Sequence, residues 1–300
     1  LLVLAVAWVG HAYLWTSLLS NFFGRAWPKA FLKTWRAITA VVIVAFPLLC
    51  WSLSNQSVIT LLVELGSAYL VLCCFVGGVV LPAITLARLL RKPPACVVAE
   101  STVTHDLWAE LGKPLIGNGK LTFAARLPGN GLFRVDFTDI TLALPELPPE
   151  WEGLTLLVVS DVHFHGTPSR LFFDRIIDEL TRGPTPDLVC LIGDYVDTDT
   201  HYEWIQPVLG RLTATEAKLA ILGNHDKHHK PEQVRAELAA AGFNVLGNTW
   251  QVVTIRGVPC LVVGHEGPWF APPPILATAP PGLFRLCLSH TPDNFYWGVA

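Results

Sequence analysis

The segment LVVSDVHFHG, residues 157–166, brings one carboxylate and two imidazoles to the end of an apolar run. The polar residues are Asp161, His163 and His165. Carboxylate and imidazole side chains at this spacing are typical ligands of a divalent metal ion. The same residue types also occur in a turn that only carries the chain out of a sheet. The remainder of the sequence has to distinguish a metal site from such a turn.

Polar clusters of the same kind follow three other apolar runs. They contain, in chain order, Asp194 with Asp197, Asn224 with His225, and His290. Turn formation alone would explain any one cluster, because Asp, Asn and Gly are common turn residues. Four clusters that each follow a predicted strand are better explained by one binding site at a single edge of a sheet.

Apolar periodicity predicts the elements that separate these clusters. Continuous apolar runs predict buried strands at 154–159, 187–193 and 218–223. After the first strand, Thr167 and Pro168 predict the cap and the first turn of a helix, because proline fits the first helical position. Each of the first two strands is therefore followed by a polar cluster and then by a connection back to the next strand.

The remaining elements continue this alternation. Further helices are predicted at 201–212 and 231–242, and further strands at 244–246, 251–256, 259–263 and 284–288. Strands that alternate with helices imply an α/β fold, in which helices cover a sheet with parallel strand pairs. Ligands bind beyond the carboxyl ends of such strands, where the polar clusters are found.

The residue types at these strand ends suit a pair of divalent ions. Asp161 and His163 can reach one ion, and Asn224 and His290 offer an amide oxygen and an imidazole to a second. Asp194 is the candidate for a carboxylate that bridges both ions, as a two-metal site requires. Mixed nitrogen and oxygen ligands accept Mn, Fe, Zn or Co, so the identity of the ions stays open.

The histidines near these ligands suggest catalytic roles. His225, next to a predicted ligand, is the candidate general acid for the leaving oxygen, and Asp197 is the candidate to hold its ring in the required tautomer. His165 is a candidate to contact a substrate, and His228 and His229 are candidates to line the substrate-binding pocket. Exposed loop histidines without a role are the alternative for these three.

Three sequence blocks together resemble a known family. They are DVH at 161–163, GDYVD at 193–197 and GNHD at 223–226, in this order and each after a strand. This combination resembles the calcineurin-like metallophosphoesterase superfamily, and LPPEWEGLTLLVVSDVH followed by LSHTPD is similar to its membrane-associated bacterial branch. The resemblance covers roughly residues 140–300. It implies a four-layer α/β/β/α sandwich with a dinuclear centre, in which the residues have the roles given above.

One block of that superfamily does not follow His290. The superfamily ends with Gly-His-x-His, which supplies one more ligand to each metal ion, whereas this sequence stops at Ala300. The segment GHE at 264–266 precedes His290 and is in the wrong order to replace that block. We therefore expect the domain to be incomplete at its C-terminus rather than degenerate.

The N-terminal part of the chain has the composition of a membrane region. Only 15% of the residues are charged, against about 25% in soluble domains, and most of the deficit lies before residue 92. The apolar runs 1–24, 37–63 and 65–87 are each long enough to cross a bilayer. A cleaved signal peptide would explain the first run but not the other two. We therefore predict about three transmembrane helices within residues 1–92.

Charge placement predicts the topology and the domain limits. Basic clusters at 25–36 and 88–92 flank the apolar runs, and the positive-inside rule puts both clusters, and with them the catalytic domain, in the cytoplasm. His11 lies inside the first run, where we expect it to make a helix–helix contact. Residues 93–139 are predicted to be a linker with edge strands, and residues 140–300 the metallophosphoesterase domain.

Together, these features predict a membrane-anchored hydrolase that depends on two divalent ions and uses a metal-bridging hydroxide to attack a phosphoester. A net charge of −3 without a basic tract argues against a nucleic-acid partner. The membrane region favours a lipid-linked phosphate or another phosphorylated small molecule as the substrate. A metal-dependent nuclease of the same superfamily and a non-catalytic metal-binding or interaction module are the alternatives.

Overall fold

A computed structural model of the chain describes residues 2–53, 60–127 and 129–299. These residues form two compact units, which we call unit 1 (residues 1–94) and unit 2 (residues 95–300). Each unit is described by itself below.

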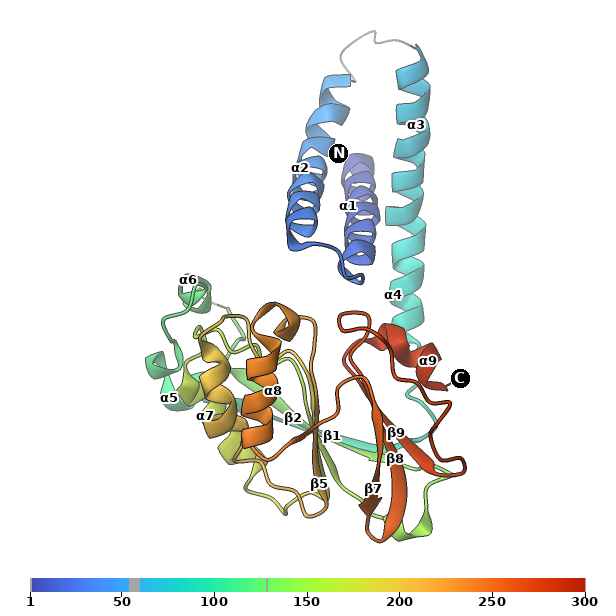
Figure 1. Cartoon of the computed structure of the whole chain (residues 1–300). Helices are drawn as coiled ribbons and strands as arrows, with labels where there is room; N and C mark the ends of the chain where they lie inside the picture. The colour runs from blue at the N-terminus through green and yellow to red at the C-terminus, as the bar shows by residue number, and fades with distance from the viewer. Residues whose placement is uncertain (1, 54–59, 128, 300) are drawn as a thin grey trace. The chain divides into compact units, whose positions relative to one another are not determined.

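Unit 1 consists of long apolar helices (Figure 1). They are α1 (Leu2–Phe23), α2 (Lys29–Leu53), and α3 (Thr60–Phe75), which continues through a π-helical turn (Val76–Val80) into α4 (Leu81–Leu89). In the described part of the chain, three helical stretches are long and apolar enough to cross a membrane, as the sequence predicts. The second helix begins earlier than the predicted run, because lysine and arginine are good helix formers and Lys29 to Arg36 join its first turns.

Two glycines allow α1 to approach the helix formed by α3 and α4. A Cβ atom at Gly10 would lie 1.9 Å from the carbonyl oxygen of Cys73, and a Cβ atom at Gly77 would lie 2.1 Å from the carbonyl oxygen of Val6. Small residues that permit such close backbone contact are typical of helix pairs in membranes. The sequence therefore allows these helices to pack without intervening side chains.

Polar groups inside unit 1 find partners on neighbouring helices. Pro47 lies inside α2 and has no N–H to donate to the carbonyl of Ile43, but the Trp8 indole donates to that oxygen at 2.8 Å. His11 is buried, its Nδ1 lies 2.8 Å from the Tyr69 hydroxyl, and its Nε2 lies 3.3 Å from a carbonyl of α2. The expected helix–helix contact of His11 is thus confirmed, and it satisfies polar groups that lipid would leave unpaired.

Two of the three described sheets of unit 2 lie face to face, with helices on the other side of the first of them (Figure 1). The first sheet is parallel, in the order β3-β4-β5-β6, and the second has the order β7-β8-β9, with β8 antiparallel to β7 and parallel to β9. The mixed α/β fold predicted from the sequence is confirmed. The elements are β3 (Leu156–Val159), α7 (Arg170–Leu180), β4 (Leu188–Ile192), β5 (Ala217–Ile221), α8 (Pro231–Ala240), β6 (Asn244–Val245), β7 (Trp250–Ile255), β8 (Val258–His265) and β9 (Phe284–Ser289).

The central strands bury side chains on both faces. On β4, Val189 and Leu191 join the apolar core on the helix side, whereas Leu188 and Cys190 join the core between the two sheets. A parallel strand covered on both faces needs a continuous apolar run, which is why these segments show no polar alternation. The polar residues are therefore confined to the strand ends.

Three predicted details differ from the structure. β3 is an edge strand, and Val158 is 59% exposed, because the contacts of the second sheet fall on β4 and β5. The predicted helix 201–212 is a 3-10 turn (His201–Trp204) followed by a π-helical turn (Ile205–Leu209). Thr167 does not cap α7, which begins at Arg170; its hydroxyl instead accepts the N–H of Leu121.

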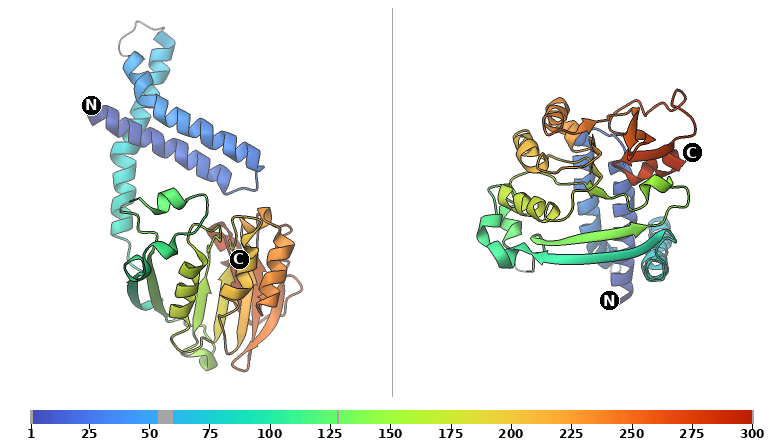
Figure 2. Two further views of the ribbon diagram at one scale, coloured as in Figure 1. Left: turned by 90° about the vertical axis from the view of Figure 1, so that its left-hand side faces the viewer. Right: turned by 90° about the horizontal axis from the view of Figure 1, so that it is seen from below.

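Residues 95–142 form a separate two-stranded sheet. β1 (Val97–Asp106) pairs antiparallel with β2 (Arg134–Leu142), so these strands pair with each other and are not simple edges of the main sheets. The view from below in Figure 2 shows them along one side of unit 2. The segment between them, residues 107–133, is called the insertion. It contains α5 (Leu107–Leu111), a 3-10 turn (Lys113–Leu115) and α6 (Thr122–Ala125).

Candidate metal centre

The loops that follow β3 and β4 have unusual backbone conformations. Asp161, His163 and Asp194 have φ angles of 56°, 44° and 58°, in the left-handed region that few residues other than glycine adopt. Hydrogen bonds between the loops hold them there, since Asp161 N–H donates to the Gly193 carbonyl and His163 N–H donates to the Asp194 carbonyl. Strain of this kind is concentrated at functional sites, where the surrounding structure maintains it.

Two glycines allow the loops after β4 and β5 to approach each other. A Cβ atom at Gly223 would lie 2.2 Å from Oδ1 of Asp194, and a Cβ atom at Gly193 would lie 2.5 Å from the Gly223 nitrogen. Gly193 also has a φ of 91°. Any side chain at these positions would push the Asp194 carboxylate away from its present place.

Asp226 is a functional residue that the sequence interpretation missed. Its buried carboxylate accepts the N–H groups of Asp194 and Tyr195 at 2.8 Å and of Gly223 at 2.9 Å. It therefore fastens the loop after β4 to the loop after β5. Its position as the last residue of the GNHD block could have indicated this role, because an acid beside predicted metal ligands requires hydrogen-bond donors.

Asp194 lies at the centre of the polar cluster. Its Oδ2 atom is 3.4 Å from Nε2 of His290, 3.7 Å from Nε2 of His163 and 4.0 Å from Nε2 of His225. These histidines come from three different loops, and only 4% of the Asp194 side chain is exposed. Four loops that are distant in sequence thus converge on one carboxylate.

The other two predicted ligands lie in the same cluster. Oδ1 of Asn224 is 3.0 Å from Nε2 of His290, and Oδ1 of Asp161 is 3.5 Å from Nε2 of His163. The structure therefore brings together all five residues that the sequence suggests as metal ligands.

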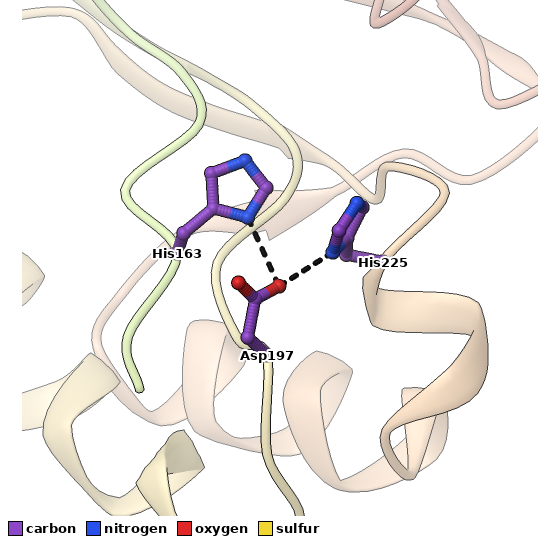
Figure 3. Close-up of side chains that lie close together, drawn as sticks. All are labelled: His163, Asp197 and His225. Atoms are coloured by element: carbon purple, nitrogen blue, oxygen red, sulfur yellow. Dashed lines mark hydrogen bonds and ion pairs between the residues drawn. The ribbon is translucent and has the colours of Figure 1, made fainter. Parts of the chain in front are cut away.

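Asp197 contacts two histidines rather than the single one predicted (Figure 3). Its Oδ1 atom accepts from Nδ1 of His225 at 2.5 Å and from Nδ1 of His163 at 3.0 Å. Because both Nδ1 atoms are used in this way, both rings present Nε2 to Asp194. Such a carboxylate fixes the tautomer and orientation of a metal-binding histidine.

His290 is oriented by the backbone. Its Nδ1 donates to the carbonyl oxygen of Ile192 at 2.7 Å, which leaves Nε2 directed at Asp194 and Asn224. Burial opposes protonation of this ring, but the interaction with Asp194 outweighs burial and raises the pKa of His290 to about 9. The pKa of Asp194 is lowered despite its burial, because His290 and the His225 N–H stabilise its charge. A proton on His290 must leave when a metal ion binds there.

The donor set of this cluster fits divalent metal ions. Two groups of ligand atoms each lie within 4.8 Å of one another: Asp161, Asp194 and His290 form one, and His163, Asp197 and His225 form the other. Imidazole nitrogens together with carboxylate and amide oxygens suit Mn, Fe, Zn and Co. The buried carboxylate charge and the strained ligand loops are features that a bound cation would stabilise.

The predicted substrate-binding histidines lie in the neighbouring loops. His165 follows His163 in the loop after β3, and His228 ends the 3-10 turn (Asp226–His228) that follows His225. The ring of His229 binds the carboxylate of Asp199, with a distance of 2.8 Å between Nδ1 and Oδ1. A role of these residues in substrate binding stays a prediction.

A buried ion pair supports the loop after β5 and was also missed. Glu266 is 1% exposed; it accepts the Leu222 N–H at 2.7 Å and binds Arg235 of α8 at 2.5 Å. Leu222 directly precedes Gly223, so the pair fixes the end of β5 from which Asn224 extends. Next to it, His265 is 4% exposed and accepts the Gly267 N–H, which makes it a structural residue.

Comparisons with known proteins show which family this part of the chain resembles. The model of the family "Calcineurin-like phosphoesterase" matches residues 154–293. An uncharacterized metallophosphoesterase, YkuE, of Bacillus subtilis (strain 168) is 26% identical over 174 residues, which are 53% of this chain and 58% of that protein. A transmembrane protein with metallophosphoesterase domain from Bos taurus is 23% identical over 244 residues, which are 73% of this chain and 50% of that protein. The chain thus spans little more than half the length of these relatives.

Proposed function

We propose that this chain, whose residues 154–293 match the calcineurin-like phosphoesterase family, is a membrane-anchored phosphoester hydrolase with two divalent metal ions. The observation that carries this proposal is the convergence of three histidine Nε2 atoms on Oδ2 of Asp194. Asp161, His163 and Asp194 would hold one ion, and Asp194, Asn224 and His290 would hold the other. When bound, such ions activate a water molecule as the nucleophile and neutralise charge on the phosphoryl oxygens.

His225 is proposed as the general acid. Its Nδ1 is held by Asp197, so a proton carried at Nε2 faces the space beside Asp194. The hydrogen bond to Asp197 is the largest cause that raises the pKa of His225, which favours the protonated ring. The side chain is 44% exposed and can therefore reach the leaving oxygen of a substrate that approaches from solvent.

Unit 1 is proposed as a three-helix membrane anchor. Its three candidate spans support this proposal, as do the relatives named as transmembrane proteins. Basic residues flank the spans at 25–36 and at 88–92, which favours a cytoplasmic location for unit 2.

The proposal is tested by measuring metal content and hydrolysis together. We expect the full chain in detergent to bind two divalent ions and to hydrolyse an aryl phosphomonoester or phosphodiester. Asp194→Ala should lose both ions and at least about a thousandfold in turnover, because both sites share this ligand. Asp178→Ala is the matched control, since this partly exposed acid on α7 pairs with Arg175 and Arg211.

The outcomes separate the competing functions. Metal binding without hydrolysis of either ester would favour a non-catalytic metal-binding module. Failure of the unaltered chain to bind metal would refute the metal centre itself. Equal turnover of Asp194→Ala and the unaltered chain would refute the role of Asp194.

A further inference from the structure

The insertion carries exposed apolar residues next to basic ones. We define the insertion surface as Lys120, Leu121, Phe123, Arg126 and Leu127. All of these residues are exposed, and the apolar ones are exposed to 58% (Leu121), 77% (Phe123) and 49% (Leu127). Residues 113–134 include Lys113 and Arg134 as well but no acidic residue, whereas the whole chain has a net charge of −3. We propose that the insertion surface binds the headgroup region of an anionic lipid bilayer.

The chemistry of this surface matches a bilayer interface. Large aromatic and aliphatic side chains gain by entering the boundary between headgroups and acyl chains, and lysine and arginine beside them bind anionic headgroups. An exposed apolar group without basic neighbours lacks the charge that binds anionic headgroups. Ile275 is an example, because it is 67% exposed but residues 257–284 contain no lysine or arginine.

Hydrogen bonds join the insertion surface to the loop that follows β3. The Gly119 N–H donates to the Gly166 carbonyl at 2.8 Å, and the Leu121 N–H donates to the Thr167 hydroxyl at 3.1 Å. A Cβ atom at Gly119 would lie 2.3 Å from that hydroxyl, so this contact leaves no space for a side chain. Gly166 and Thr167 belong to the loop that also carries His163 and His165.

The figures show that the insertion stands at an edge of unit 2. In Figure 1, α5 and α6 lie beside α7 at the side of the unit, and α6 is not covered by another element of unit 2. The Ser169 N–H, just before α7, donates to the Leu115 carbonyl at 2.8 Å, which fixes the insertion to that helix. The apolar side chains of the surface are thus exposed, while the backbone of the insertion is hydrogen-bonded to the start of α7.

The segment that joins the two units is short. Residues 90–96 join α4, the end of the third candidate span, to β1. A segment of this length extends over about 25 Å at most. A globular unit on so short a tether remains within reach of the bilayer that the span crosses.

Binding of the insertion surface to a bilayer also bears on the substrate, and this step rests on the proposed function. A bilayer bound at the insertion surface places lipid headgroups beside the loop of His163 and His165. We therefore assign the substrate class as a phosphoester carried by a membrane lipid, rather than a freely diffusing phosphate compound.

Lipid contact is tested with a photoreactive residue in the full chain. Benzoylphenylalanine replaces Phe123 in one variant and Ile275 in another, and both are placed in nanodiscs of phosphatidylglycerol. We expect lipid crosslinking at position 123 to exceed that at 275 by at least about fivefold. The double variant Lys120→Glu with Arg126→Glu should reduce crosslinking at 123 in phosphatidylglycerol but not in phosphatidylcholine. Equal crosslinking at 123 and 275 would overturn the proposal.

Substrate delivery is tested with the same double variant and two esters. It should hydrolyse a water-soluble aryl phosphodiester like the unaltered chain, yet lose at least about fivefold in rate on the same ester attached to a diacylglycerol in the bilayer. Equal losses on both esters, or no loss on either, would overturn the lipid substrate. If the unaltered chain hydrolyses neither ester, the proposed function and the substrate assignment fail, while the crosslinking result still decides the membrane contact.

Discussion

Asp197 shows how one carboxylate oxygen can organise two imidazoles. Its Oδ1 atom accepts from His163, a proposed metal ligand, and from His225, the proposed acid. Burial opposes the charge of Asp197, but hydrogen bonds from both rings outweigh it and hold the pKa of this carboxyl well below its usual range. The two imidazoles therefore stabilise the charged form of Asp197, which joins the proposed metal ligand to the proposed acid.

The first prediction concerns Asp197→Asn. The amide oxygen of asparagine lacks the full negative charge with which the Asp197 carboxylate accepts both Nδ1–H groups. Both imidazole rings therefore lose their fixed orientation. We expect turnover and metal affinity each to fall by about 10- to 100-fold. Metal titration of the full chain and hydrolysis of an aryl phosphodiester measure the two effects.

His225→Ala is the comparison for that variant. It removes the proposed acid but leaves the contact between Asp197 and His163, so turnover should fall while metal content is retained. If Asp197→Asn also retained full metal affinity, the contact with His163 would have no part in metal binding.

At the scale of elements, the sequence predicted the strands that carry the site. β4 and β5 are continuous apolar runs that end in polar residues, and this pattern is local. The exposed face of β3 was not predictable in this way, because a strand becomes an edge only through the pairing of distant segments. The insertion was missed because its helices are too short to show helical periodicity.

The candidate site, too, was predictable from the sequence only in part. Candidate ligands could be recognised from the residue types at strand ends, such as Asp161, Asp194 and His290, since residue chemistry and spacing are properties of the sequence. The shared use of Asp197 and the anchoring by Asp226 depend on how closely two loops approach. That approach is a property of the fold.

The second prediction uses Gly223, where two loops meet. In Gly223→Ala the new Cβ atom would collide with Oδ1 of Asp194, so this carboxylate or its loop must move. We expect a loss of about 1–3 kcal/mol in stability and at least about a tenfold loss in turnover. Thermal unfolding and metal content of the full chain are the measurements.

Gly183→Ala provides the matched control, since a Cβ atom at Gly183 meets no atom within 4 Å. This variant should have the same thermal unfolding transition and the same metal content as the unaltered chain. Similar metal loss in both variants would mean that the contact between Gly223 and Asp194 does not determine the site.

At the scale of the molecule, each unit has its own core. Ala7, Phe46 and Cys73 form a buried cluster within unit 1, whereas the large clusters of unit 2 lie on the two faces of its parallel sheet. The two sheets of unit 2 share an apolar core that includes Leu219 and Val262. Because the metal centre lies at the end of the first sheet, its geometry depends on how that sheet is fixed within unit 2.

Asp187 joins the two sheets at the opposite end from the metal centre. It precedes β4, and its carboxylate accepts the N–H and the hydroxyl of Thr155 at 2.8 Å. It also binds Nε and Nη2 of Arg256, each at 3.0 Å, and Arg256 lies in the turn between β7 and β8. Burial alone would raise the pKa of Asp187, but the hydrogen bonds from Thr155 and Arg256 outweigh it and lower the pKa.

The last prediction concerns the pH dependence of this junction. The folded-state pKa of Asp187 lies below the unfolded value of about 3.9, so ionised Asp187 stabilises the fold above that pH. This contribution is lost as the pH falls through the folded pKa. We expect Asp187→Asn to reduce the free energy of unfolding by about 1–3 kcal/mol at neutral pH, and the difference from the unaltered chain to shrink below about pH 4. Unfolding is measured in chelator, so that metal release from the distant centre does not contribute. A difference that stays constant down to pH 2 would show that the charge of Asp187 does not stabilise the contact between the sheets.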